Sequence, residues 1–242
     1  MREDEEFLKF ILPMSKKDID NYKKYSKVRS KELYYYLSKF LHCYHDKPEV
    51  DYEVVSQWIR FDKDVKNILY RFYATFEEYF KAVILNEVVF DEENNFVKRE
   101  ESNKRFPNNP VMDALNINYQ KIFKNKNIPN FFSDKKFSAL NLPFNFSEIK
   151  KINNLRNKIM HLSFILLPIY DENLNEDNVE KRVIDYLAQT NDQICTLINN
   201  LPSPWNEYLK DELKTTLKYK DRKIGKLLTR NLDSKLILDI LK

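Results

Sequence analysis

Glycine is almost missing from this chain, and its scarcity is the strongest restriction on the fold. The 242 residues include one glycine, Gly225, where an average usage of about 7% would give about seventeen. Without glycines a chain cannot build a Gly-rich phosphate loop, a dinucleotide-binding fingerprint or a nucleophile elbow, and it forms few tight hairpins. The sequence therefore argues against most ATPase, kinase, oxidoreductase and hydrolase folds.

The hydrophobic pattern predicts an all-α fold. Hydrophobic residues make up 43% of the chain and aromatic residues 14%, which is enough to build a packed core. Nine prolines separate segments in which apolar residues recur at helical spacing, and no strand-like alternation lasts more than a few residues. We expect helices from a Ser15 cap to about His45, from about Val54 to Leu85, over 148–167, over 178–200 and over 205–242.

The chain is expected to divide into three parts. These are an N-terminal helical extension (1–50), a helical core (51–201) and a basic C-terminal helical segment (202–242). Within the core, residues 91–147 are rich in Asn, Lys, Phe and Pro, and their periodicity is weak. We interpret them as a long irregular insert with short helices near Val111–Phe123 and Ser133–Leu140.

Charge and cysteine usage narrow the class of partner and the compartment. The formal charge is +4, from 41 Lys and Arg against 37 Asp and Glu, which permits a nucleic acid partner without requiring one. Cys43 and Cys195 lack the paired spacing of a zinc site or a disulfide framework. No apolar run is long enough to span a bilayer, and the N-terminus is too acidic for a signal peptide. We expect a cytoplasmic protein with no membrane partner, no cofactor and no metal site.

One predicted helix, 148–167, carries the candidate chemistry. Its residues Ile152, Leu155, Ile159, Leu162 and Leu166 share one core face. Beside that face lie a fixed cation, two amides and one imidazole, and the two amides and the imidazole are spaced at i, i+4 and i+8. These four residues are Asn153, Arg156, Asn157 and His161.

An arginine and a histidine together suit the transesterification of RNA. Arg156 offers a planar fork of donors to a phosphate, and the His161 imidazole exchanges a proton near neutral pH. The reaction needs both functions, because a 2′-hydroxyl attacks the phosphate while charge builds on the phosphorane oxygens. The alternative reading is that Arg156 makes a surface ion pair and His161 is a satisfied core histidine.

At these residues the sequence resembles a known family. The run from Leu155 to His161, LRNKIMH, is similar to the R-N-x-x-x-H signature of the HEPN ribonuclease superfamily. The surroundings resemble its Abi (abortive infection) branch, which is related to the HEPN domains of RNA-guided CRISPR ribonucleases. In that branch a Phe-Asp segment leads into a helix that carries a glutamate, as in Ile59–Leu69 and Phe76–Lys81 here. Many relatives carry a small residue before the histidine and a second histidine after it, where this chain has Met160 and Leu162.

The resemblance implies a HEPN-like helical bundle that forms a homodimer with a composite active site. Arg156 would bind the scissile phosphate, His161 would act as general acid or base, and Asn157 would orient one of them. The products would carry 2′,3′-cyclic phosphate and 5′-hydroxyl ends, without a metal. A carboxylate of Glu77 or Glu78, on the preceding helix, would orient Arg156, although glutamates on helices are usually solvated. Asn153 would be a further supporting residue.

The function expected from this resemblance is that of a toxin-like, antiphage abortive-infection ribonuclease in a bacterium. Its partners would be an RNA substrate and either a non-coding RNA or a protein antitoxin. Two alternatives stay open. The chain could be a catalytically silent helical module with an RNA-binding or regulatory role, or an inactive dimeric partner of an antitoxin.

A basic stripe on the C-terminal helix is a candidate RNA-binding surface. Six Lys and Arg residues recur every fourth position and wind around the predicted helix. The alternative is a solvated face with i,i+4 ion pairs. The stripe comprises Lys210, Lys214, Lys218, Arg222, Lys226 and Arg230.

Overall fold

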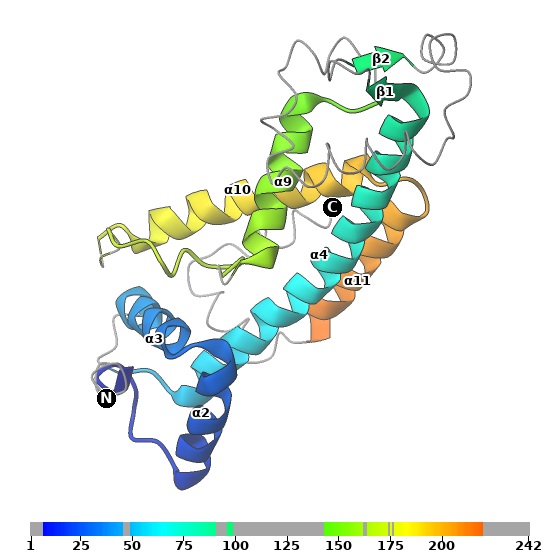
Figure 1. The fold of residues 1–242 in the computed structure, drawn as a ribbon. Helices are drawn as coiled ribbons and strands as arrows, with labels where there is room; N and C mark the ends of the chain where they lie inside the picture. The colour runs from blue at the N-terminus through cyan, green and yellow to red at the C-terminus, as the bar shows by residue number, and fades with distance from the viewer. Residues whose placement is uncertain are drawn as a thin grey trace. The chain divides into compact units, whose positions relative to one another are not determined.

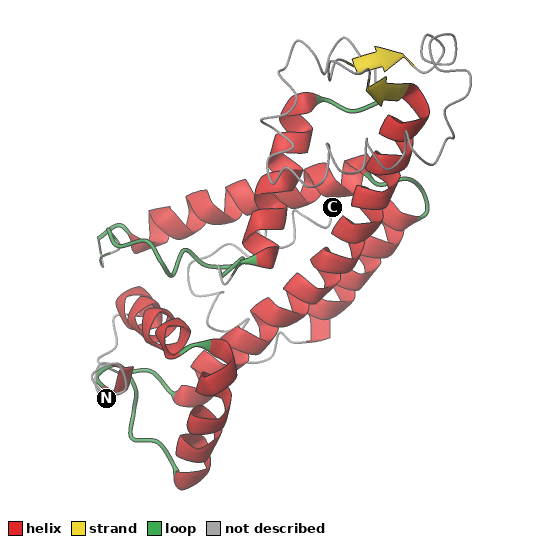
Figure 2. Cartoon of the chain, viewed as in Figure 1, coloured by secondary structure: helices red, strands yellow, loops and turns green. Residues whose placement is uncertain are grey.

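The all-α prediction is confirmed. A computed structural model describes residues 7–45, 49–90, 96–98, 143–161, 164–173, 175 and 177–219. Within these residues six helices account for most of the ordered structure, coloured in chain order in Figure 1 and by type in Figure 2. They are α2 (Lys16–Arg29), α3 (Lys31–His45), α4 (Tyr52–Glu87), α9 (Phe146–Met160), α10 (Val179–Asn200) and α11 (Trp205–Tyr219).

The predicted single helix from Ser15 to His45 is wrong, because the structure has two helices there. Ser15 caps α2 as predicted, since its hydroxyl accepts a hydrogen bond from the Asp18 amide at 3.2 Å. α2 ends at Ser30, whose φ of 68° is incompatible with a right-handed helix. The Ser30 hydroxyl then accepts a hydrogen bond from the Glu32 amide and so starts α3. A serine supplies the positive φ that most chains give to glycine.

The predicted long helix is confirmed as α4, which runs unbroken through Phe61 and Asp62 for 36 residues. The Asp51 carboxylate caps its first turn by accepting a hydrogen bond from the Glu53 amide at 2.8 Å. Apolar residues recur along the helix at helical spacing, and its buried residues include Val55, Trp58, Phe61, Asp62, Val65, Ile68, Leu69, Phe72, Phe76 and Phe80.

A short antiparallel hairpin follows α4. Strand β1 (Val88–Phe90) pairs with β2 (Phe96–Lys98), and Val89 lies opposite Val97. Of these three-residue strands, β1 lies just before the predicted insert (91–147) and β2 lies within it. The two short helices predicted near Val111–Phe123 and Ser133–Leu140 lie outside the described residues.

The C-terminal helices agree with the periodicity as far as the structure describes them. α10 ends at Asn200, shortly before Pro202, and its buried residues include Val179, Val183, Leu187, Ile194, Leu197 and Ile198. α11 buries Leu209 and Leu213. Residues 220–242, which were also expected to be helical, lie outside the described residues.

The chain divides into two compact units, each built from separate segments. One unit comprises Met1–Leu69, Lys158–Asp192 and Lys210–Lys242, and the other comprises Tyr70–Asn157 and Gln193–Leu209. We call them the N-terminal unit and the central unit. In the N-terminal unit an aromatic cluster forms part of the core: Phe7, Tyr22, Tyr34 and Tyr52, with ring centroids 4.7–6.5 Å apart.

In the central unit, aromatic residues of α4 pack around Phe144, which lies two residues before the start of α9. The ring centroids of Phe76, Tyr79 and Phe80 lie 6.0, 5.6 and 5.2 Å from that of Phe144. Phe144 is buried. The cluster therefore fixes the start of α9, the helix that carries the candidate site, against α4.

Candidate functional site

The site helix α9 begins at Phe146, two residues before the predicted start at 148. Asn145 is the cap, because its side-chain oxygen accepts a hydrogen bond from the Ser147 amide at 2.9 Å. Its backbone carbonyl accepts from the amides of Glu148 and Ile149. α9 buries Ile149, Ile152, Leu155 and Ile159, so the predicted core face is confirmed over this length.

The predicted end of this helix is wrong. α9 ends at Met160 rather than near Leu167, and His161 lies in a bend immediately beyond it. The i, i+4, i+8 series from Asn153 therefore reaches Asn157 within the helix but not His161. His161 is exposed, which contradicts the alternative that it is a core histidine.

The reason for the early end lies in distant polar groups that bind the backbone after His161. The Asp62 carboxylate accepts hydrogen bonds from the amides of Ile165 and Leu166 at 2.7 and 3.3 Å. The Tyr186 hydroxyl donates to the Phe164 carbonyl at 2.6 Å. These partners replace the i→i−4 bonds that a longer helix would make. Phe164, Ile165 and Leu166 are all buried in this non-helical segment.

The Arg156 side chain lies against two neighbouring side chains, those of Asn157 and Tyr73. Its guanidinium donates to the Asn157 side-chain oxygen at 3.3 Å and lies close enough to the Tyr73 hydroxyl of α4 to act on the pKa of that group. Arg156 and Asn157 are half-buried, whereas Tyr73 is buried. Burial raises the pKa of Tyr73 to about 12, and the nearby Glu77 charge adds to this, whereas Arg156 acts in the opposite direction. Tyr73 is therefore a neutral partner that the sequence did not indicate, since tyrosine at such a spacing is ordinarily packing.

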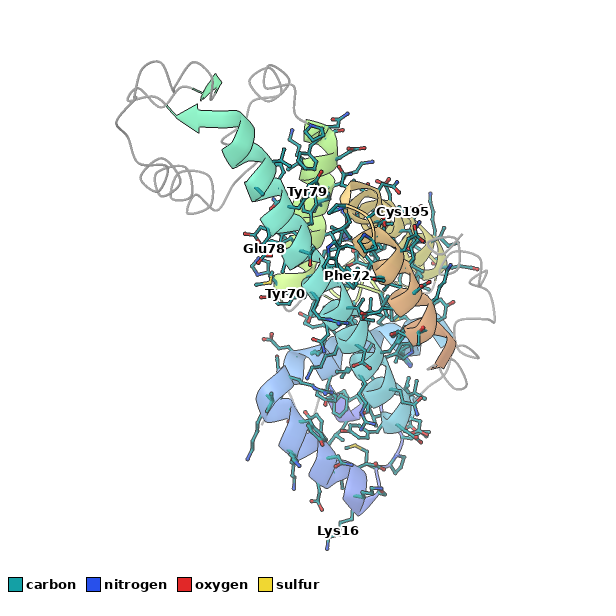
Figure 3. All side chains as sticks on the ribbon, turned by 90° about the vertical axis from the view of Figure 1, so that its right-hand side faces the viewer. Lys16, Tyr70, Phe72, Glu78, Tyr79 and Cys195 are labelled. Carbon is teal, nitrogen blue, oxygen red and sulfur yellow. The ribbon has the colours of Figure 1, made fainter. Side chains whose placement is uncertain are left out.

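The two candidate glutamates differ in position. Glu77 is half-buried one turn after Tyr73, close enough for its charge to raise the Tyr73 pKa. Glu78 is exposed, and Figure 3 shows it on the outside of α4. Of the two glutamates, Glu77 is therefore the one that lies near Tyr73, the neighbour of Arg156. Asn153 is half-buried one turn before Asn157.

Lys158 is a second residue that the sequence did not indicate. Its ammonium donates to the Thr190 hydroxyl at 3.0 Å and to the Gln189 side-chain oxygen at 3.4 Å. It also lies 4.3 Å from the centroid of the Tyr186 ring, a cation–π distance. Burial lowers its pKa to about 8. A lysine on an amphipathic helix is usually solvated, so only the tertiary structure identifies this one.

The basic stripe is described in part. Lys210 is half-buried and Lys214 is exposed. Lys218 lies in α11, but its side chain is outside the described part of the structure. Arg222, Lys226 and Arg230 lie wholly outside the described residues.

Comparison with known proteins adds no assignment. No protein-family model, no curated protein and no solved structure matches the chain. Among the described residues, no group of three or more His, Cys, Asp and Glu side chains is arranged to hold a metal ion. In the same residues, no helix combines the length and apolar character needed to cross a membrane.

Proposed function

We propose that this chain is an endoribonuclease that cleaves RNA by metal-independent transesterification. The observation that carries the proposal is the guanidinium of Arg156, which donates to Asn157 and lies beside the Tyr73 hydroxyl, on the same helix that ends one residue before an exposed imidazole. An arginine fixed in this way offers its remaining N–H groups to a phosphate with little loss of side-chain entropy.

In the proposed reaction a 2′-hydroxyl oxygen of the RNA attacks the adjacent phosphorus. The O2′–P bond forms and the P–O5′ bond breaks, which leaves a 2′,3′-cyclic phosphate and a 5′-hydroxyl. One base removes the 2′-hydroxyl proton and one acid protonates O5′, and His161 performs one of these transfers. Arg156 stabilises the negative charge on the phosphorane oxygens.

The proposed enzyme acts as a homodimer, so that a second His161 is available for the other proton transfer. Met160 is the position that tests this part of the proposal, because this large apolar side chain next to His161 is 49% exposed. A Met160→Glu variant is expected to be monomeric by light scattering and to lose cleavage, whereas Ile184→Glu, on α10 and 37% exposed, is expected to stay dimeric.

The biological role that we propose is toxin-like antiphage defence by abortive infection. A non-coding RNA or a protein antitoxin would neutralise the activity. This role rests on the R-N-x-x-x-H resemblance at Arg156, Asn157 and His161.

The test is cleavage of structured and single-stranded RNA by the purified protein in the presence of EDTA. Arg156→Ala and His161→Ala are each expected to lower the rate by about 10²–10³-fold, the usual effect of removing a charge-stabilising or proton-transfer group. Asn154→Ala, an exposed position of α9, is the matched control and should retain full activity. Loss of cleavage on adding EDTA contradicts the metal-independent mechanism.

The same experiment separates the alternatives. RNA binding without cleavage would identify a silent RNA-binding module, in which Arg156 grips a phosphate without turnover. Neither binding nor cleavage would favour the partner of an antitoxin.

A further inference from the structure

The segment after His161 is fixed through its backbone within the N-terminal unit. Asp62, on α4, is 103 residues before Ile165 and binds its amide at 2.7 Å. The next amide, of Leu166, donates to the same carboxylate oxygen. Two successive backbone N–H groups thus converge on one carboxylate oxygen. Tyr186, on α10, holds the carbonyl that precedes them, that of Phe164.

Asp62 is an unusual residue to find in this place. Its side chain is 4% exposed, and its other oxygen is 2.7 Å from the Lys66 ammonium, one turn along α4. Lys66 also lies 5.9 Å from the centroid of the Phe164 ring. A buried carboxylate is costly unless it is both paired and hydrogen-bonded. Asp62 is both, and both of its amide donors belong to the segment that follows His161.

These contacts exclude the longer helix that the sequence predicts. A helix that continued through Leu166 would turn the Ile165 and Leu166 amides toward carbonyls four residues earlier. The Asp62 carboxylate takes both amides instead. The backbone at His161 lies in a bend rather than in a helical turn, three residues before the Phe164 carbonyl that Tyr186 holds.

We propose that Asp62 is a positioning residue for His161, acting through the hydrogen bonds that it accepts from Ile165 and Leu166. The catalytic part of this inference rests on the proposed ribonuclease function. The structural part, that Asp62 fixes the surroundings of the imidazole, does not depend on it.

The experiment compares Asp62→Leu with Asp62→Asn in the full chain. Asparagine keeps an oxygen that can accept from the two amides, whereas leucine has none. Only three histidines exist, so the imidazole NMR signals are assigned with His161→Ala. Asp185→Asn, an exposed aspartate of α10 beside Tyr186, is the matched control.

We expect the His161 signal to shift in Asp62→Leu and to stay near its wild-type position in Asp62→Asn and Asp185→Asn. In the cleavage assay, kcat of Asp62→Leu should fall about 100-fold, as for a displaced catalytic group, while KM changes less than about threefold. Asp62→Asn should recover most of that loss. A purely structural role would lower the amount of folded protein and leave kcat per folded molecule unchanged.

Tyr186→Phe keeps the test decisive if Asp62→Leu does not fold. It removes only the hydroxyl that donates to Phe164, and it should shift the His161 signal and lower kcat by a smaller factor. An unchanged His161 signal in a folded Asp62→Leu, or in Tyr186→Phe if the leucine variant is unfolded, would overturn the inference. If the wild type cleaves no RNA, the proposed function fails, and the NMR comparison still decides the placement of the imidazole.

Discussion

Arg156 and His161 belong to the same short motif, yet the molecule fixes them by different means. Arg156 is placed through its side chain, which donates to Asn157 and lies beside the Tyr73 hydroxyl of α4. The His161 side chain is exposed, and the contacts near it are made to the backbone that follows, at Phe164, Ile165 and Leu166. The difference suits the two tasks, since a phosphate ligand gains from a rigid fork of donors, whereas an acid–base group must exchange protons with its surroundings.

The largest effect is expected from changing the shape of the anchored cation. Arg156→Lys keeps the charge but loses the planar fork that can hold Tyr73, Asn157 and a phosphate together. We expect a fall in kcat of about 100-fold or more in single-turnover cleavage. Arg71→Lys, at an exposed position of α4, should cleave at the wild-type rate. Equal rates for Arg156→Lys and wild type would show that charge alone suffices.

A smaller effect is expected from removing one anchor of Arg156. Tyr73→Phe deletes the hydroxyl and keeps the buried ring, so the fold should persist. A hydrogen bond to a charged group contributes about 1.5–3 kcal/mol, and the Asn157 contact remains, so we expect a loss in kcat/KM of about tenfold. The matched control is Tyr70→Phe, whose side chain is 49% exposed three residues earlier on α4. If the two variants behave alike, Tyr73 does not anchor Arg156 in solution.

The pH dependence of stability tests the neighbourhood of Lys158. Its pKa is lowered from 10.5 to about 8 in the folded protein, so between about pH 8 and 10 the unfolded chain binds more protons than the folded one. Stability should therefore rise with pH in this window, by less than the roughly 1.4 kcal/mol per pH unit of a full proton, because the half-buried side chain still contacts water.

Urea unfolding at several pH values measures this rise. Lys158→Met, which keeps the aliphatic part of the side chain, should abolish it, and Lys181→Met at an exposed position of α10 should not. Above pH 10 the opposite trend should appear. Burial raises the pKa of Tyr73 to about 12, so its ionisation in the unfolded chain lowers stability there. A flat profile between pH 8 and 10 in the wild type would contradict the burial of the ammonium.

The smallest effect is expected on the basic stripe. Lys214→Gln should weaken RNA binding a few-fold and reduce the salt dependence of log K by about 0.7, as for one phosphate contact on a single strand. Lys181→Gln serves as the control. Fluorescence anisotropy between 50 and 200 mM salt, over which the Debye length falls by about half, measures both. An unchanged salt slope would show that Lys214 does not contact RNA and belongs to a solvated face of α11.

The sequence predicted best where one periodic signal ran long. α4 and α10 hold their apolar spacing over 36 and 22 residues, so local pattern and tertiary packing agree and both helices were found. The pattern failed where distant residues decide. No residue around Met160 predicts a helix end, and the groups that bind the backbone beyond it, Asp62 and Tyr186, are 98 residues before it and 26 after it in the sequence.

The break at Ser30 was missed for a related reason. Serine is not a typical residue for a positive φ, and the apolar spacing continues across it from α2 into α3. The Arg156–Asn157 contact, by contrast, joins neighbours in sequence, so the motif itself contained that part of the site.

The 103-residue separation between Asp62 and Ile165 has a consequence for folding kinetics. Contacts so distant in sequence form only after a long loop has closed, and they lag behind local helices such as α2 and α3. The turn after α9 is therefore expected to take its final form late in folding. During synthesis the chain must be extended beyond Leu166 before that turn can exist. A nascent chain would therefore contain Arg156, Asn157 and His161 before it contains the later residues whose contacts fix the turn.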